Sequence, residues 1–258
     1  ATKWKAVDPN TWYFFLREDV KFSNGQPMTS EDVVFSILRA KQRTSDFKEY
    51  ISTISGVKAI DKYTVQIKTS KPNPILLNQL SNIFIMSKEW SAKNFALSPQ
   101  NWDAGQETFS ATNAMGTGPF KITLREPNTK TVFKKNGKWW GNVEHNITEI
   151  QLLPIKNAAT RVAALLSGEI DLVTDAPVQD LNRISSSGGH KVESTPQMRT
   201  IFLGMDQKAD KLRTGNTGDN PFKKKEVRQA LYQAIDIEAI KKKVMRGLSE
   251  PAGIITFP

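Results

Sequence analysis

Residues that commonly do chemistry in proteins are few and scattered in this sequence. The two histidines, His145 and His190, stand far apart, and neither has a second ligand at a spacing that suits a metal ion. No Gly-x-Ser-x-Gly motif marks a serine nucleophile, and the 0 cysteines exclude thiol catalysis, disulfides and thiolate metal sites. Glu31 and Asp32 are adjacent carboxylates, but negative charge in the first turn of a helix explains them better than acid–base chemistry. The sequence therefore predicts no catalytic residues, no metal site and no cofactor.

Aromatic residues give better evidence of a binding site. Five of them could line an apolar pocket: Phe84, Trp90, Trp102, Trp139 and Trp140. An apolar pocket with aromatic walls beside backbone donors suits a peptide or a metal chelate. A place in the hydrophobic core is the more common role of such rings. We take Phe84 and Trp102 as candidate ligand-binding residues, and Trp90 and Trp102 as candidate anchors of the stretch 88–116.

A glycine-rich segment, Gly116-Thr117-Gly118-Pro119, is the next candidate. It lacks the third glycine of a dinucleotide-binding loop, and Pro119 would stop a helix that began there. The phosphate-binding interpretation is therefore disfavoured. We expect a backbone role, a tight entry into a sheet beside a cleft, with Gly116 and Thr117 at the binding site.

The elements that would position these residues can be predicted from local patterns. Residues 12–16 alternate as a strand, Ser23-Asn24-Gly25 is a turn, and Thr29 caps a helix. The buried stripe of that helix is predicted to be Val33, Val34, Ile37 and Leu38. Residues 54–68 and 120–135 read as two hairpins.

Further along, strands and helices alternate. Strands are predicted at 83–86, 147–155, 170–173 and 200–204. Helices are predicted at 157–167, ended by Gly168, and from Pro177 to about residue 185. After Pro221 we expect one helix that ends near Ile235 and a second, capped by Asp236, that ends at Gly247.

Length and charge set broader bounds. The 258 residues could form one large domain or two smaller ones, and the net charge is +10, from 36 basic and 26 acidic residues. The charge could indicate an anionic partner, but the basic residues are scattered, with the densest runs at 223–225 and 241–243. A solvated basic surface is the preferred interpretation, and we expect no nucleic-acid partner. No apolar run approaches the roughly 20 residues needed to span a bilayer.

Three stretches of the sequence resemble the signatures of family 5 extracellular solute-binding proteins. The first signature is matched by Leu16-Arg17, Val20, Phe22, Asn24-Gly25, Pro27, Thr29, Glu31-Asp32-Val33 and Phe35-Ser36. The second is matched by residues 116–120, the following hairpin and Trp139-Trp140-Gly141, where Tyr-Trp is usual. It continues in Thr160-Arg161 and Gly168-Glu169-Ile170-Asp171. The third signature is similar to Pro221-Phe222, Val227-Arg228, Ala230-Leu231 and Ala234-Ile235-Asp236.

This resemblance implies a fold and a division into domains. The fold class would be α/β, periplasmic-binding-protein type II-like. Residues 1–115 would be the accessory subdomain of lobe I, residues 116–203 its central sheet, and residues 204–258 the truncated beginning of lobe II. Family members are about twice this length, so the chain is expected to be a fragment.

The resemblance also implies a function. The protein would be the substrate-binding component of a peptide-type ABC importer, which binds oligopeptides or dipeptides by lobe closure without chemistry. A nickel chelate or another small solute is the alternative ligand. The expected partners are the solute and an ABC permease in the membrane, with the protein itself monomeric. It would be periplasmic, or lipid-anchored to the outer face of the cell membrane.

Three more candidate residues follow from the resemblance alone. Lys135 stands where nickel-binding relatives carry an arginine that reaches a ligand carboxylate; lysine lacks the bidentate fork of arginine. Met198 and Arg199 lie where the first crossing between the lobes is expected. Arg199 could equally be a salt-bridged structural residue.

Two function classes remain as alternatives. One is a transcription regulator that carries this chain as its ligand sensor. A helix-turn-helix encoded ahead of Ala1 in the parent gene would favour the regulator, and a signal peptide there would favour transport. The other is a hydrolase, which is disfavoured because no nucleophile–base constellation is present in the sequence.

Overall fold

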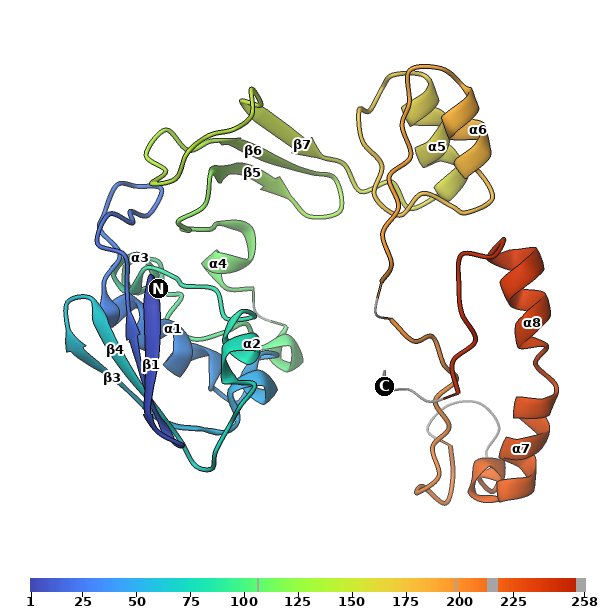
Figure 1. Cartoon of the computed structure of the whole chain (residues 1–258), viewed down its shortest axis with the longest axis horizontal. Helices are drawn as coiled ribbons and strands as arrows, with labels where there is room; N and C mark the ends of the chain where they lie inside the picture. Colours follow the sequence, from blue (N-terminus) through green and yellow to red (C-terminus); the bar gives the residue numbers. More distant parts are fainter. Residues whose placement is uncertain (106, 198, 213–217, 254–258) are drawn as a thin grey trace. The chain divides into compact units, whose positions relative to one another are not determined.

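The computed structural model describes residues 1–105, 107–197, 199–212 and 218–253. Of the sequence-based expectations, only Met198 falls entirely outside these residues. The chain forms two compact units, Ala1–Pro154 and Ile155–Pro258 (Figure 1). We describe each unit by itself.

The first unit begins with a four-stranded antiparallel sheet of order β1-β2-β4-β3. Its strands are β1 (Lys3–Asp8), β2 (Thr11–Phe15), β3 (Ile54–Asp61) and β4 (Thr64–Thr69). In the register of the sheet, Trp12 pairs with Ile67, and Ala59 pairs with Val65. The predicted first strand and first hairpin are confirmed. Strand β1 was not predicted, and its six residues are all exposed.

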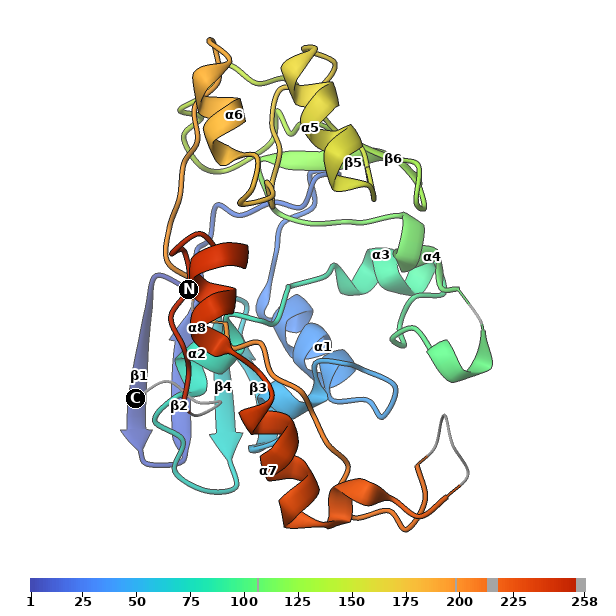
Figure 2. The ribbon, with the colours of Figure 1, turned by 90° about the vertical axis from the view of Figure 1, so that its right-hand side faces the viewer.

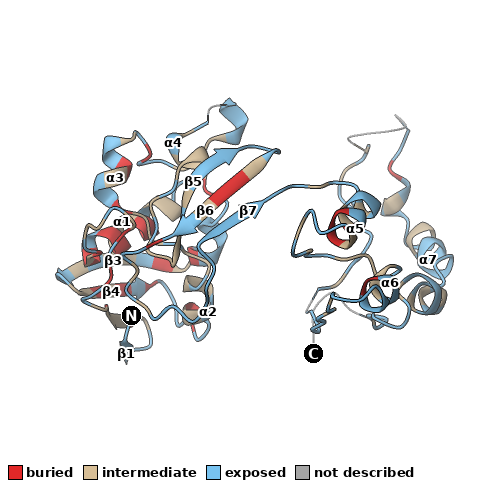
Figure 3. Cartoon of the chain, turned by 90° about the horizontal axis from the view of Figure 1, so that it is seen from above, coloured by how far each residue is buried: buried red, intermediate tan, exposed pale blue. Residues whose placement is uncertain are grey.

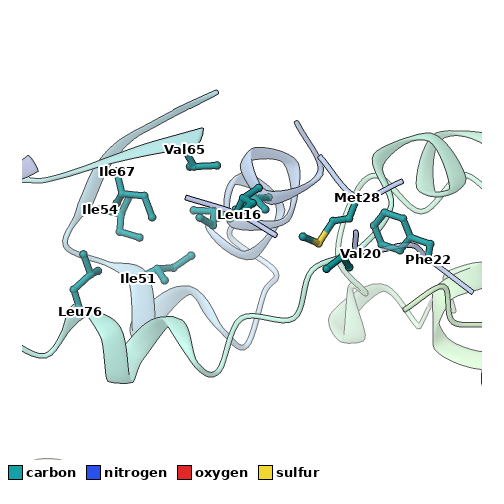
Figure 4. Packing of buried hydrophobic residues seen from close by; sticks show 11 residues of the cluster. Leu16, Val20, Phe22, Met28, Ile51, Ile54, Val65, Ile67 and Leu76 are labelled. Atoms are coloured by element: carbon teal, nitrogen blue, oxygen red, sulfur yellow. The ribbon is translucent and has the colours of Figure 1, made fainter. Parts of the chain in front are cut away.

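Helix α1 (Ser30–Ala40) supplies the other layer of this core. Apolar side chains from the β2–α1 connection, the sheet and the short helices η1 (Lys48–Ile51) and α2 (Leu76–Leu80) pack with it (Figure 4). The most buried are Phe22, Ile37, Ile51, Ile54, Val65, Ile67 and Leu76. Buried positions concentrate in this unit (Figure 3). Burial of apolar area at about 25 cal/mol per Å² makes this cluster the main stabilising feature of the unit.

The buried face of α1 is more polar than predicted. Val33 and Ile37 are buried, but Leu38 is 52% exposed, so its assignment to the buried stripe was wrong. Ser30, Asp32 and Ser36 are buried instead. The five buried residues keep the i, i+3, i+4 spacing of one helix face. This face is rotated about the helix axis relative to the apolar stripe that was predicted.

Asp32 explains why a polar face can be buried. One of its carboxylate oxygens accepts from the backbone N–H of Thr29 (2.9 Å) and from its hydroxyl (3.1 Å), which caps α1. The other accepts from the backbone N–H of Lys88 (2.9 Å). One turn later, the Ser36 hydroxyl accepts from the N–H of Met86 (2.8 Å). These bonds fix residues 86–88 and thereby the start of α3 (Lys88–Lys93).

The same bonds account for a strand that was predicted wrongly. Residues 83–86 have no strand structure, although their apolar sequence suggested one. Ile83 and Ile85 pack against the core, and Met86 bonds to a helix side chain rather than to a sheet. Apolar residues in a short run indicate burial, and they do not by themselves determine the backbone conformation.

A second sheet completes the first unit. It has the antiparallel order β5-β6-β7, with β5 (Phe120–Glu126), β6 (Lys130–Lys135) and β7 (Glu149–Leu152). The predicted second hairpin is confirmed, and β7 is shorter than the predicted strand 147–155. Two short helical elements, η2 (Trp102–Ala104) and α4 (Phe109–Thr112), precede the sheet.

The second unit is mainly helical. Its helices are α5 (Ala158–Leu166), α6 (Leu181–Ser186), η3 (Pro221–Lys223), α7 (Lys225–Gln233), α8 (Ile237–Ala239) and the π-helical η4 (Ile240–Val244). The predicted stop at Gly168 is confirmed by its φ of +78°, and the cap at Asp236 by its bond from the N–H of Ala239 (2.8 Å). A small cluster of Val162, Leu165 and Ile184 is its core. Helix α6 begins later than predicted, because a turn occupies the residues after Pro177.

Two predicted strands of this unit, 170–173 and 200–204, are absent from the described structure. Leu172 is 78% exposed and Ile201 is 83% exposed. An extended segment becomes a β-strand only when a neighbour pairs with it, and no strand among the described residues pairs with either segment. None of the helices in the part of the chain described here has the length and apolarity to cross a membrane.

Replacement of Asp32 by alanine tests the structural role of its carboxylate. The change removes the cap of α1 and leaves the N–H of Lys88 without its acceptor. We expect the free energy of unfolding to fall by about 2 kcal/mol. Urea denaturation followed by far-UV circular dichroism measures it.

The control is Glu31→Ala. Glu31 precedes Asp32 in the same turn, and its ion pair with Lys88 (2.9 Å) is exposed on both sides. This variant should lose about 0.5 kcal/mol or less. Equal losses in the two variants would show that the buried carboxylate has no special role.

Candidate functional site

The glycine-rich segment 116–119 is held by its backbone carbonyl groups. The carbonyl of Gly116 accepts from the N–H of Ser23 (2.9 Å), and that of Thr117 accepts from the indole Nε1 of Trp140 (3.1 Å). Asn136 binds the next two carbonyls, through its side-chain Nδ2 to Gly118 (2.9 Å) and its N–H to Pro119 (2.7 Å). Four successive carbonyl groups are therefore occupied within the protein.

The amide N–H groups of the same segment differ from its carbonyl groups in their hydrogen bonding. Within the described residues, the N–H groups of Gly116, Thr117 and Gly118 have no hydrogen-bond acceptor. Consecutive free N–H groups on an immobilised backbone can donate to a carboxylate or to a peptide carbonyl. We call residues 116–118 the amide loop.

The turn at residues 23–25 supports the amide loop from the other side. Besides its N–H bond to Gly116, Ser23 has its hydroxyl 3.2 Å from the Sδ of Met115. Gly25 has a φ of +94°, which disfavours any residue with a Cβ, and a Cβ there would lie 2.8 Å from the Nζ of Lys138. Lys138 donates to the carbonyl of Asn24 (3.3 Å). The turn is thus fitted closely to the segment that follows β6.

Arg17 adds a charged contact to this junction. Its guanidinium lies 4.6 Å from the ring centroid of Trp140 and pairs with Asp19 at 2.7 Å. The hydrogen bond from Arg17 holds the pKa of the Asp19 carboxyl below its usual range. The Arg17–Trp140 contact orients the indole that binds Thr117, so three segments far apart in the sequence meet here.

The candidate residues from the sequence fall into different places. Gly116 and Thr117 lie in the amide loop. Lys135 is exposed at the end of β6, one residue before Asn136, and its N–H donates to Thr148 (2.8 Å). Phe84 is 78% exposed and Trp102 is 67% exposed, so Trp102 is not the buried anchor that we predicted.

The aromatic rings do not form one pocket. Trp139 and Trp140 contact each other at the amide loop (5.7 Å between centroids), whereas Trp90 contacts Phe109 (5.7 Å). Neither Phe84 nor Trp102 contacts another ring among the described residues. The structure thus brings Gly116 and Thr117 together with the strand end that carries Lys135, and it leaves Phe84 and Trp102 apart from the ring pairs.

The remaining two candidates lie after the first unit. Met198 is outside the described residues. Arg199 belongs to the second unit, where its side chain is exposed and its N–H donates to Gln197 (3.0 Å). Their assignment to the binding site stays a prediction.

Several residues of the site were not singled out as ligand-site candidates from the sequence: Arg17, Ser23, Asn136 and Trp140. All lie within or beside the first two of the three signatures already quoted. Asn136 is 3% exposed, and a buried amide between two strands usually has a structural partner. That partner could not be identified from the sequence because the two contacts of Asn136 cross a hairpin.

The chain is mixed α/β, and its clearest candidate site is the amide loop. Free backbone N–H groups suit the binding of a ligand. A comparison with known protein families identifies the family to which the chain belongs. Residues 1–258 match the family described as "Bacterial extracellular solute-binding proteins, family 5 Middle". The chain belongs to this family of solute-binding proteins, as its sequence signatures predicted.

Individual relatives agree with this assignment. The chain is 26% identical to the periplasmic murein peptide-binding protein MppA of Escherichia coli in an alignment 271 residues long, which covers 98% of the chain and 47% of MppA. It is also 26% identical to the nickel-binding periplasmic protein of E. coli, covering 100% of the chain and 47% of that protein. The chain therefore spans about half the length of the curated relatives that it matches.

A solved structure confirms the fold class. The crystal structure of NikZ from Campylobacter jejuni in complex with Ni(L-His) superposes with a TM-score of 0.82 at 23% identity. The match covers 99% of the present chain and 48% of NikZ. The predicted α/β, binding-protein-like fold is confirmed, while the proposed domain boundaries at 115/116 and 203/204 stay a prediction.

Replacement of Trp140 by phenylalanine tests the indole bond to the amide loop. Phenylalanine keeps an aromatic ring but removes the donor, so the Thr117 carbonyl loses its partner. We expect a loss of about 1 kcal/mol in the free energy of unfolding, measured by urea denaturation with far-UV circular dichroism. Trp102→Phe, at an exposed ring, is the matched control and should change stability by less than about 0.5 kcal/mol.

The Arg17–Asp19 pair predicts a pH dependence. Because the folded-state pKa of Asp19 is lowered, the pair contributes above the unfolded pKa of about 3.9 and is lost as the pH falls through the folded value. The indole ¹H–¹⁵N signal of Trp140 should therefore shift with a midpoint below pH ~3.9. In Asp19→Asn this titration should disappear, and a midpoint unchanged by that substitution would contradict the coupling.

Proposed function

We propose that this chain is part of the substrate-binding component of a peptide-type ABC importer, which binds oligopeptides or dipeptides without chemistry. Family membership supports a solute-binding role. A peptide ligand is supported by the murein peptide-binding relative and by the kind of donor that the site offers. A nickel chelate or another small solute is the alternative, because a nickel-binding relative is equally similar.

The observation that carries the proposal is the amide loop. Its carbonyl groups are engaged inside the protein, so only its N–H groups face a new partner. Such donors suit the carbonyls and the carboxylate that every peptide possesses, whatever its side chains. Recognition through the backbone is the property that a receptor for mixed peptides requires.

Lys135 would add charge to this recognition. It directly precedes Asn136, whose bonds hold the amide loop, and its side chain forms no ion pair among the described residues. A lysine ammonium attracts a carboxylate as a point charge, without the planar fork of arginine. The terminal carboxylate of a peptide is the group that we assign to it.

The wider parts of the proposal concern the whole protein. Two lobes would close over the solute, with Met198 and Arg199 at the crossing between them, and a membrane permease would recognise the closed form. The periplasmic relatives support a location outside the cytoplasmic membrane, with or without a lipid anchor. We assign residues 1–115 and 116–203 to lobe I, residues 204–258 to lobe II, and a monomeric state to the protein.

Binding of the tripeptide Ala-Ala-Ala tests the proposal. The protein should be intact, with any residues that its gene encodes beyond this chain. We expect Lys135→Gln to weaken binding about tenfold in isothermal titration calorimetry, because a charged hydrogen bond is lost. Capping the peptide as its C-terminal amide should weaken binding similarly and should abolish the effect of the substitution.

Lys121→Gln is the matched control. Lys121 is an exposed lysine of the same sheet, opposite Lys134 in the strand register and therefore on the face away from Lys135. Equal affinities for the unaltered protein and Lys135→Gln would remove Lys135 from the site. Binding of Ni(L-His)₂ in place of every peptide tried would favour the alternative ligand.

A further inference from the structure

A second cavity lies away from the amide loop. It has a volume of about 400 Å³ and lies among α3, α4 and β5 of the first unit. Figure 1 shows α4 between β5 and α3, and Figure 2 shows α3 and α4 side by side. None of the candidate residues Phe84, Trp102, Gly116, Thr117 or Lys135 lines this cavity. Its size is within the range of small-molecule sites.

Two aromatic rings form one wall of the cavity. Trp90 and Phe109 lie 5.7 Å apart between centroids at an angle of 48°. Trp90 is positioned by the capped start of α3, where its N–H donates to the Ser87 hydroxyl (3.2 Å). Ile122 and Leu124 of β5 add apolar surface. These side chains can contact the flat or branched apolar body of a small ligand.

The polar groups at the cavity are anchored to the backbone around them. Asn94 donates through Nδ2 to the carbonyl of Trp90 (2.8 Å), and Asn113 donates through Nδ2 to the carbonyl of Phe109 (3.1 Å). These bonds hold the amide side chains in fixed positions. A site whose polar groups are already ordered loses less entropy when it binds a ligand.

Arg125 gives the cavity its charge. Its Nε donates to the carbonyl of Ala111 (3.0 Å), and its Nη1 lies 3.4 Å from the hydroxyl of Thr131. No carboxylate among the described residues pairs with it, and no Asp or Glu lines the cavity. Its Nη2 has no partner among the described residues. Nε and Nη1 are therefore engaged by the protein, and Nη2 can donate to an anion.

We propose that this cavity is a second binding site, which takes a small organic carboxylate with an apolar body. The carboxylate accepts from the Nη2 of Arg125, and the apolar body lies against Trp90 and Phe109. This inference is independent of the proposed solute site, because the two have no residue in common.

Sodium phenylacetate is the probe for this site, and phenylacetamide is its neutral isostere. Ligand-observed NMR titrations on the full chain measure both dissociation constants. We expect phenylacetate to bind about tenfold more tightly than phenylacetamide, since only the former makes a charged hydrogen bond. Equal affinities, or no binding of phenylacetate at 10 mM or below (about 2.7 kcal/mol), would overturn the proposal.

Single substitutions test where phenylacetate binds on the protein. Arg125→Gln should weaken phenylacetate about tenfold and leave phenylacetamide unchanged. Arg43→Gln is the matched control, because Arg43 is an exposed arginine that does not line this cavity. Lys135→Gln should also have no effect; a loss of phenylacetate binding in that variant would place the anion at the solute site instead. If Arg125→Gln fails to fold, the comparison of the two probes on the unaltered protein decides.

Discussion

The hydrogen bond from Ser23 to the carbonyl of Gly116 is the contact on which the candidate site depends. It connects the turn that follows the first strands with the segment that enters the second sheet. Around it, Trp140 binds the carbonyl of Thr117, Asn136 binds that of Gly118, and Lys138 binds the carbonyl of Asn24 in the turn. A loop with so many engaged acceptors cannot rotate its peptide groups without breaking several bonds. Its free N–H groups are therefore presented in a fixed arrangement before any ligand arrives, which lowers the entropic cost of binding.

Local chemistry explains what could be predicted from the sequence. The two hairpins, the stop at Gly168 and the cap at Asp236 each depend on residues within a few positions of one another. The burial of residues on α1, in contrast, does not depend on local sequence alone. Asp32 and Ser36 are polar, yet both are buried because their acceptors bind the N–H groups of residues 86–88. Partners 50 or more residues away cannot be predicted from a helix pattern, so the apolar stripe was extended wrongly to Leu38.

Pairing explains most of the remaining errors. Strands were predicted at 83–86, 170–173 and 200–204 from short apolar runs, and none is a strand here. Strand β1 shows the converse, since its six residues are all exposed and its conformation depends on backbone bonds to β2. Side-chain pattern indicates which residues avoid water, whereas strand formation also needs a neighbour in register. For the site, a backbone role was predicted for the glycine-rich segment, and its place at a binding site stays a prediction. The contacts that immobilise it were not predicted, because Asn136 and Trp140 bind it across the second sheet, 18 and 23 positions away, and Ser23 binds it from 93 positions away.

The use of backbone donors has a consequence for selectivity. An N–H group of the amide loop senses only an acceptor and its direction, so it distinguishes a carboxylate or a peptide carbonyl from an apolar group but not one side chain from another. Selection among solutes must then come from charge and from the shape of the surrounding walls. Lys135 would contribute charge to the proposed site without the directional fork of arginine. A ligand carboxylate could then approach its ammonium group from several directions. Arg125 differs from it in this respect, because two of its nitrogens are already oriented by Ala111 and Thr131. On these grounds the amide loop suits a range of related solutes, whereas the cavity beside α4 suits a narrower class of anions.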